Sequence, residues 1–305
     1  MELENCATVY GPEVGRVCQR AAHVGWDATV GAGWLSTLAV VIAGFVFAAL
    51  VATLTPQRAD GATGDEHPGE HRVQVGDSLP VFLGSFLALL MASLFYALVS
   101  AEFHPLRIGA AAGIATAVFA AGAVQTFVAI TWLFLASPRT TAAFGSLKVC
   151  VRYVMFVSGL YLYVTVHKAQ TTTSLDGWSW PVTLLFLAFL VLPWVAARAI
   201  THSERIMARI GRPQLTALRI SVVFLTGAGL ALAWVIDRSA VTVGNAYPMW
   251  LAGAILLSVG LLYGAYELNL PRPIHRHSAR KARTACTGPD AEPASPGGEL
   301  IMAVR

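Results

Sequence analysis

The chain has 305 residues, of which 56% are hydrophobic and only 12% are charged, and its formal net charge is +4. Soluble domains carry about 25% charged residues, so this composition excludes an ordinary soluble globule. The basic residues lie at the ends of apolar runs and form no single patch, so we predict no nucleic-acid partner.

Long apolar runs dominate the sequence. A helix needs about 20 apolar residues to cross the hydrocarbon core of a bilayer. The sequence therefore predicts an all-α fold, a bundle of seven transmembrane helices in a multi-pass protein of the cell (cytoplasmic) membrane, with the lipid bilayer as its surroundings. The predicted spans are Trp34–Leu54, Leu79–Ala101, Ile108–Ser137, Val149–Val166, Pro181–Ala199, Ile220–Ile236 and Tyr247–Leu268.

The distribution of Lys and Arg predicts the orientation, because these residues are retained on the cytoplasmic side. With the N-terminus outside, 16 of the 21 basic residues fall on inner segments. The chain then divides into an extracytoplasmic or interfacial segment (1–33), the transmembrane domain (34–270) and a disordered basic cytoplasmic tail (271–305). Charged residues ahead of the first run predict that no signal peptide is cleaved.

Two connecting segments have distinctive compositions. Residues 57–76 are rich in Gly, Asp, Glu and His and predict a flexible inner loop. Within them, His67 to His71 match the letters of a zinc-peptidase motif, but the Pro-Gly pair disfavours the helix that this motif requires. Residues 198–219 predict a short basic helix on the inner surface, where anionic lipid would be a partner.

No motif for a metal or another cofactor is apparent, so we predict neither. The last span has no lysine for a retinal Schiff base, the spans hold no paired histidines for haem, and no Walker A sequence occurs. The four cysteines lack zinc-type spacing. Cys6 and Cys18 are either a disulfide or two free thiols, and Cys150 is expected to be a small apolar filler in a span.

Polar residues gather at the predicted outer ends of the spans. The stretch Phe95–Arg107 passes from an apolar run into Glu102, His104, Pro105 and Arg107, and Pro105 is placed to start the third helix close behind the second. Other loops at this level add acids and rings, namely Asp176, Asp237, Tyr161, Tyr163, Trp178, Trp180, Trp234, Tyr247 and Trp250. An ordinary interfacial belt of aromatic residues with solvated loop ends also explains them, since such belts are expected in almost any membrane protein of this kind.

The same residues also suit a mouth into which an apolar molecule enters from the bilayer. A carboxyl group against apolar walls has a raised pKa and can act as a general acid near neutral pH. Aromatic faces stabilise carbocations, and a second carboxylate or His104 would take the final proton. Such parts suit proton-initiated cyclisation of a lipophilic prenyl chain.

In span count, size, lack of metal motifs and position of its acids, the chain resembles the small seven-span membrane-bound terpene cyclases that act on prenylated aromatic or meroterpenoid substrates. Carried over by position, the resemblance implies that Glu102 is the proton donor and Asp237 the second essential acid. A family acid in the last span would instead correspond to Glu267, which the predicted topology puts at the opposite face.

Readings without covalent chemistry stay open. Gln125 and Thr126 lie inside the third span, where polar groups either line a pore or join helices, so a transporter, a channel or an immunity-type protein is the main alternative. A scaffold or sensor that uses the basic inner segments is a third. Gly227, Gly229 and the pair Gly253 and Gly260 are expected to allow close helix packing.

The Ala, Gly, Val and Arg content is typical of a GC-rich bacterial genome.

Overall fold

The computed structural model describes residues 28–54, 68–102, 105–135, 144–173, 180–201, 213–237 and 251–269, which all belong to one compact unit. Seven α-helices make up nearly all of these residues, so the described part of the chain confirms the predicted all-α class. The helices are α3 (Ala28–Leu54), α4 (Pro68–Ala101), α5 (Pro105–Leu135), α6 (Phe144–Thr173), α7 (Trp180–Thr201), α9 (Pro213–Asp237) and α11 (Ala252–Asn269).

Six of these helices are long and apolar enough to cross a membrane, as judged from length and composition. They are α3, α4, α5, α6, α7 and α9, and their apolar segments have 18 to 28 residues. The apolar part of α11, Ala252–Leu268, is shorter. The described helices therefore form a bundle suited to a membrane.

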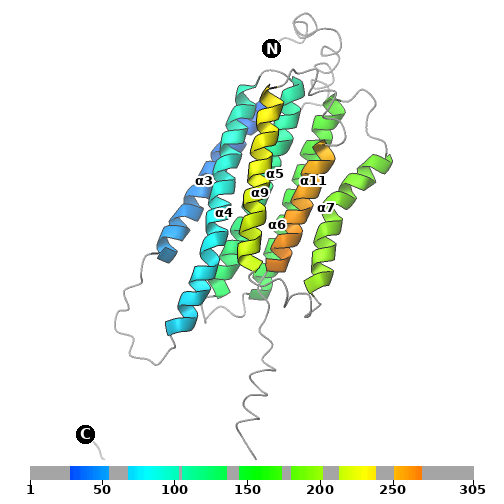
Figure 1. Cartoon of the computed structure of the whole chain (residues 1–305). Coiled ribbons are helices and arrows are strands. Elements are labelled where there is room, and N and C mark those ends of the chain that lie inside the picture. The colour runs from blue at the N-terminus through cyan, green and yellow to red at the C-terminus, as the bar shows by residue number, and fades with distance from the viewer. Residues whose placement is uncertain are drawn as a thin grey trace, which may run out of the picture. The chain divides into compact units, whose positions relative to one another are not determined.

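Helix α5 lies at the centre of the bundle (Figure 1). It packs against α3, α4, α6, α9 and α11. In its most apolar stretch of 18 residues 78% of the residues are buried, compared with 12% in the corresponding stretch of α7. Alanine fills much of its buried surface and lets neighbouring backbones approach closely. The buried alanines of α5 are Ala110, Ala111, Ala112, Ala115, Ala117, Ala120, Ala121 and Ala129.

The helices run up and down in turn, so α7 and α11 are parallel to each other (Figure 1). Helix α7 packs chiefly against α11, and α9 contacts α4, α5 and α11. One end of the bundle therefore gathers the end of α4, the start of α5 and the end of α9. The opposite end gathers the start of α6 and the ends of α7 and α11.

Two predicted connecting segments differ from the structure. Helix α4 begins at Pro68, so the second half of the predicted 57–76 loop is helical. Proline is favoured in the first turn of a helix, where its missing N–H has no intrahelical partner to lose. The ends of the basic segment 198–219 also belong to longer helices and not to a separate short one. Arg198 lies in α7, and Arg219 lies in α9. Residues 202–212 lie outside the described ranges.

Candidate functional site

The first candidate site is the corner between α4 and α5. Helix α4 ends at Ala101, the Glu102 amide donates to the carbonyl oxygen of Val99 at 3.3 Å, and α5 begins at Pro105. The fixed φ of proline is already helical, so the chain turns within three residues. The prediction that Pro105 starts the helix is confirmed, and Glu102 is held at a tight interhelical corner.

Glu102 forms an ion pair with Arg107 across this corner. Glu102 Oε2 lies 3.7 Å from Arg107 Nη1, and the two side chains are 19% and 26% exposed. Arg107 Nε is buried and has no hydrogen-bond partner in the part of the chain that the structure describes. A buried donor without an acceptor costs free energy. The Arg107 Nε–H is therefore placed to donate a hydrogen bond to an acceptor atom that lies outside the described residues.

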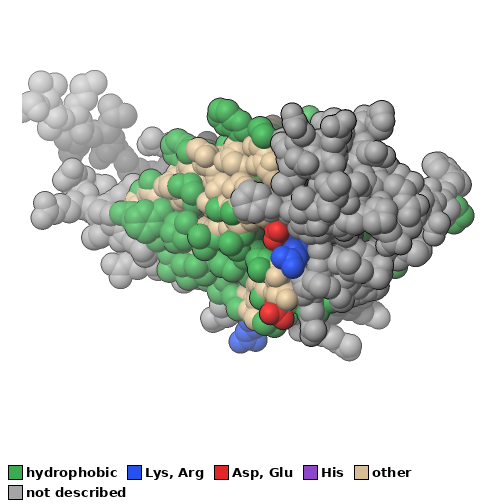
Figure 2. Space-filling view, turned by 90° about the horizontal axis from the view of Figure 1, so that it is seen from above, with side chains coloured by type: hydrophobic (Ala, Val, Ile, Leu, Met, Phe, Trp, Pro, Cys, Tyr) green, Lys and Arg blue, Asp and Glu red, His purple; other side chains and the backbone are tan. Residues whose placement is uncertain are grey.

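The ion pair lines a cavity of about 170 Å³ between α4, α5 and α9. Apart from the two charged residues the lining is apolar, and it consists of Leu98, Ala101, Ala111, Leu232, Val235 and Ile236. Figure 2 views this end of the bundle, where a few acidic and basic side chains lie among hydrophobic ones. The geometry suits a mostly apolar molecule that carries one hydrogen-bond acceptor.

The structure brings only some of the predicted site residues together around the Glu102 cavity. Ile236, next to Asp237, lines the cavity, whereas Asp237 itself is exposed at the end of α9. Trp234 packs against the hydrophobic core and Tyr161 is 43% exposed on α6, and neither residue lines the Glu102 cavity. Five predicted residues, His104, Asp176, Trp178, Tyr247 and Trp250, lie outside the described residues, as does the side chain of Trp180.

A second polar cluster lies at the opposite end and was missed as a unit. Arg152 of α6 donates through Nη2 to Glu267 Oε1 of α11 at 2.6 Å and through Nε to the same oxygen at 3.2 Å. Trp194 Nε1 of α7 donates to Glu267 Oε2 at 3.3 Å. The sequence shows that Arg152 and Glu267 are opposite charges inside two separate apolar runs, but it does not show that the two residues meet.

A hydrogen-bond network joins α4, α5, α9 and α11. Gln125 Oε1 of α5 accepts from Tyr266 of α11 at 3.1 Å and from Ser221 of α9 at 3.4 Å. Thr126 and Ser85 of α4 share a bond of 2.5 Å, and each hydroxyl also bonds the Gly122 carbonyl oxygen. Of the two roles predicted for Gln125 and Thr126, these bonds favour joining helices.

Replacing Gln125 with leucine should weaken this network measurably. The variant removes the acceptor of two interhelical bonds, although Tyr266 and Ser221 remain 3.3 Å apart. Side-chain hydrogen bonds between membrane helices contribute about 0.6 kcal/mol on average and up to about 1.7 kcal/mol. We expect a loss in this range, measured by SDS titration. Thr226→Val is the control, because that exposed hydroxyl bonds only within its own helix, to Val222 O.

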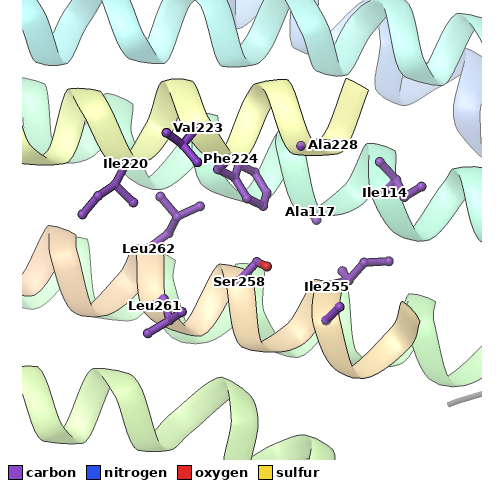
Figure 3. A pocket seen from close by; sticks show the side chains of 12 residues that line it. Ile114, Ala117, Ile220, Val223, Phe224, Ala228, Ile255, Ser258, Leu261 and Leu262 are labelled. Carbon is purple, nitrogen blue, oxygen red and sulfur yellow. The ribbon is translucent and has the colours of Figure 1, made fainter. Parts of the chain in front are cut away.

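An apolar groove larger than the Glu102 cavity lies between α9 and α11, with α5 behind it (Figure 3). Its volume is about 390 Å³, and Ser258 is the single polar side chain of its lining. The other lining residues are Ile114, Ala117, Ile220, Val223, Phe224, Gly227, Ala228, Ala254, Ile255, Leu261 and Leu262. Such a surface suits lipid tails and provides no group for acid–base chemistry.

Among the described residues, no three His, Cys, Asp or Glu side chains come together as a metal site would require. Cys150 is a free thiol and lies exposed on α6, so it does not fill an interior gap as predicted. The corner at Glu102 thus offers a carboxylate, a guanidinium and apolar walls as its chemical groups.

The chain was compared with protein-family models, with curated proteins and with solved structures, and none of them matches it.

Proposed function

We propose that the protein is an integral membrane enzyme that acts on a lipophilic substrate at the corner between α4 and α5, most concretely by proton-initiated cyclisation of a prenyl or terpenoid chain. The observation that carries the proposal is the apolar cavity lined by Glu102 and Arg107, in which Arg107 Nε has no described partner. A carboxyl group and a strong donor against apolar walls are the parts that this chemistry needs.

The roles follow from the positions of the two groups. Arg107 donates to an oxygen on the substrate, while the Glu102 carboxyl delivers a proton to the end of the chain that reacts. Ring closure then gives a carbocation, and transfer of a proton from carbon to a second carboxylate or to His104 gives a product with the same mass as the substrate. Donation requires a protonated carboxyl group whereas the ion pair requires the carboxylate, so substrate binding has to draw Arg107 away from Glu102.

The size of the cavity limits what enters it. A cavity of about 150 Å³ accommodates benzene in a well-studied protein core, and the Glu102 cavity of about 170 Å³ is similar. It holds one ring or the reacting end of a chain, so the remainder of a prenyl substrate would lie along lipid-facing helix surfaces. The terpene cyclase reading therefore requires a substrate that is only partly enclosed.

We also propose how the chain crosses the membrane. Seven spans, with α11 as the seventh, an outer N-terminus and a cytoplasmic C-terminus put Glu102 at the outer face of the cell membrane. The supporting observation is the alternating direction of the helices (Figure 1) together with the inner bias of Lys and Arg. If a membrane-impermeant thiol reagent labels Cys286 in intact cells, the C-terminus is outside and the proposed orientation is wrong.

Glu102→Gln should abolish turnover while leaving the shape of the corner. Loss of a general acid typically lowers a rate by about 10² to 10⁴-fold. The purified full-length protein is incubated with linear prenylated quinols and their terminal epoxides, and mass spectrometry then follows products isomeric with each substrate. We expect at least a 100-fold loss for this variant.

Ser100→Ala is the matched control, because Ser100 is exposed two residues before Glu102 and its hydroxyl bonds Ala97 O within α4. It should keep full activity. Unchanged product formation by the Glu102→Gln variant, expressed at the wild-type level, would contradict the proposed role of Glu102.

A membrane protein without covalent chemistry is the second candidate, and the Arg152–Glu267 pair favours it. Ionisable residues inside a membrane domain frequently mark ion or substrate pathways, and Glu267 is 3% exposed. Liposomes containing the purified protein separate the two readings. Flux of ions or solutes that Glu267→Gln abolishes and Glu102→Gln leaves intact would support transport in place of cyclisation.

A further inference from the structure

We propose that α6, α7 and α11 form a binding site for one anionic phospholipid, whose phosphate binds Arg152 and whose acyl chain lies in the groove between α6 and α7. The site is at the opposite end of the bundle from Glu102. It does not depend on cyclisation at Glu102, because it uses none of the residues of that corner.

The phosphate end of the site is an oriented guanidinium. Arg152 uses Nε and Nη2 for Glu267, and no acceptor for Nη1 occurs among the described residues, so the two Nη1 hydrogens can bind another acceptor. The Arg152 side chain is 33% exposed while that of Glu267 is 2% exposed, so the ion pair points its cationic side out of the bundle. Trp194 fixes the second carboxylate oxygen. A guanidinium held in this way suits an oxygen of a phosphate.

Two further cations lie close along the same helices. Lys148 precedes Arg152 by one turn of α6, and Arg198 follows Trp194 by one turn of α7, so each lies on the same helix face as its neighbour. The formal charges of Lys148, Arg152, Arg198 and Glu267 sum to +2. A phospholipid with a net negative headgroup is therefore favoured over a zwitterionic one.

An apolar groove continues from this charged end. It has a volume of about 100 Å³ and is lined by residues of α6, α7 and α11, among them Phe156, Leu160, Leu187 and Tyr263. Trp194 belongs both to the groove and to the ion pair, and Met155, three residues after Arg152, also lines the groove. Headgroup contacts and chain contacts therefore form one continuous surface.

The occupant follows from this continuity. The groove lies within the apolar segments of α6 and α7, where the available molecules are lipids. A single strong cation at one end of an apolar groove matches an amphiphile with one anionic head. A peptide or a second copy of the chain would have to bury the exposed guanidinium against an acid of its own.

Lipid binding can be tested on the full-length protein in detergent by native mass spectrometry. Phosphatidylglycerol and phosphatidylcholine with the same acyl chains are added in parallel, and bound lipid is quantified. We expect tighter binding of phosphatidylglycerol to the wild type. The double variant Arg152→Gln with Glu267→Gln keeps the net charge and leaves no buried carboxylate unpaired. It should bind phosphatidylglycerol about five- to tenfold more weakly.

Arg219→Gln is the matched control. Arg219 is an exposed cation on α9, two residues before Ser221, which bonds Tyr266 next to Glu267. It therefore lies at the same end of the bundle, and its loss should change binding less than twofold. Leu160→Trp, which fills the groove, should weaken binding of both lipids while the ion pair stays intact.

Three results would overturn the proposal. The first is equal binding of the two lipids by the wild type, and the second is unchanged phosphatidylglycerol binding by the double variant. The third is an equal loss in the Arg219→Gln control. Melting curves without added lipid identify a folding defect. If the double variant melts below the wild type, Arg152→Lys takes its place. This variant keeps the charge but loses the planar fork of the guanidinium, and it is expected to show the same weakening of phosphatidylglycerol binding in a folded protein.

Discussion

Replacing Arg152 with methionine should destabilise the bundle by about 3 to 5 kcal/mol, the cost of leaving a buried charge without its partner. Glu267 is 2% exposed in its side chain and would retain only the Trp194 bond, at 3.3 Å. The reverse change, Glu267→Met, should cost much less. Arg152 is one-third exposed, and a long basic side chain near a helix end can reach the membrane surface.

The asymmetry between the two variants distinguishes a buried acid from a symmetric surface pair. The double variant Arg152→Met with Glu267→Met should recover most of the loss, since apolar replacement of a buried pair is often neutral. SDS titration in mixed micelles gives the free energies of unfolding, with tryptophan fluorescence as the signal. Additive effects of the two single variants would show that no coupling exists between Arg152 and Glu267.

The helices were predictable because their signal is local. Six helices contain apolar segments that overlap predicted spans, and Pro105 begins α5 as expected. Helix α6 extends beyond the predicted span in both directions, to Phe144 and Thr173. Hydropathy measures only the part of a helix that suits lipid, whereas backbone hydrogen bonds continue the helix through polar residues.

The partners of side chains were not predictable in the same way. Glu267 was placed in the last span, but its partner Arg152 was treated as one of the inner basic residues that set topology. These residues are 115 positions apart in the chain. Apolar periodicity gives no information on which helix faces which, so a pair that joins α6 and α11 appears only once the bundle is assembled.

The Glu102 corner lies between these two cases. Glu102, Pro105 and Arg107 are neighbours in sequence, so their proximity follows from a short turn between two helices. Part of the cavity wall comes from α9, more than 120 residues later, and no sequence signal distinguishes Leu232 and Val235 from Trp234 as lining residues. Of the predicted aromatic residues with described side chains, Trp234 and Tyr161 do not line the cavity, and the side chains of Trp178, Trp180, Tyr247 and Trp250 lie outside the described part of the chain.

Packing of α7 against α11 depends on two glycines four residues apart, and replacing the first should have a large effect. A Cβ at Gly260 would overlap the carbonyl oxygen of Phe189 and lie 2.9 Å from that of Leu190. Both obstacles are backbone atoms, so no side chain can rotate to make room. A Cβ at Gly264 would likewise lie 2.9 Å from the carbonyl oxygen of Pro193. This is the small-residue spacing that lets membrane helices approach closely.

Gly260→Ala should therefore destabilise the protein by about 1 to 3 kcal/mol or more, the range for overpacking a close contact. The control is Gly227→Ala on α9, where a Cβ would meet nothing within 4 Å. That variant should lose no stability, since alanine is the better helix former. Both are compared in the same SDS titration.

Because Tyr263, Tyr266 and Glu267 lie on α11 together with Gly260, the same substitution should also disturb the polar contacts of that helix. Separation of α7 from α11 would move Trp194 away from Glu267, whose bond to it spans 3.3 Å. Phosphatidylglycerol binding should then fall together with stability in Gly260→Ala and stay at the wild-type level in Gly227→Ala. Equal stability of the two alanine variants would mean that α7 and α11 do not approach as closely as the glycine geometry requires.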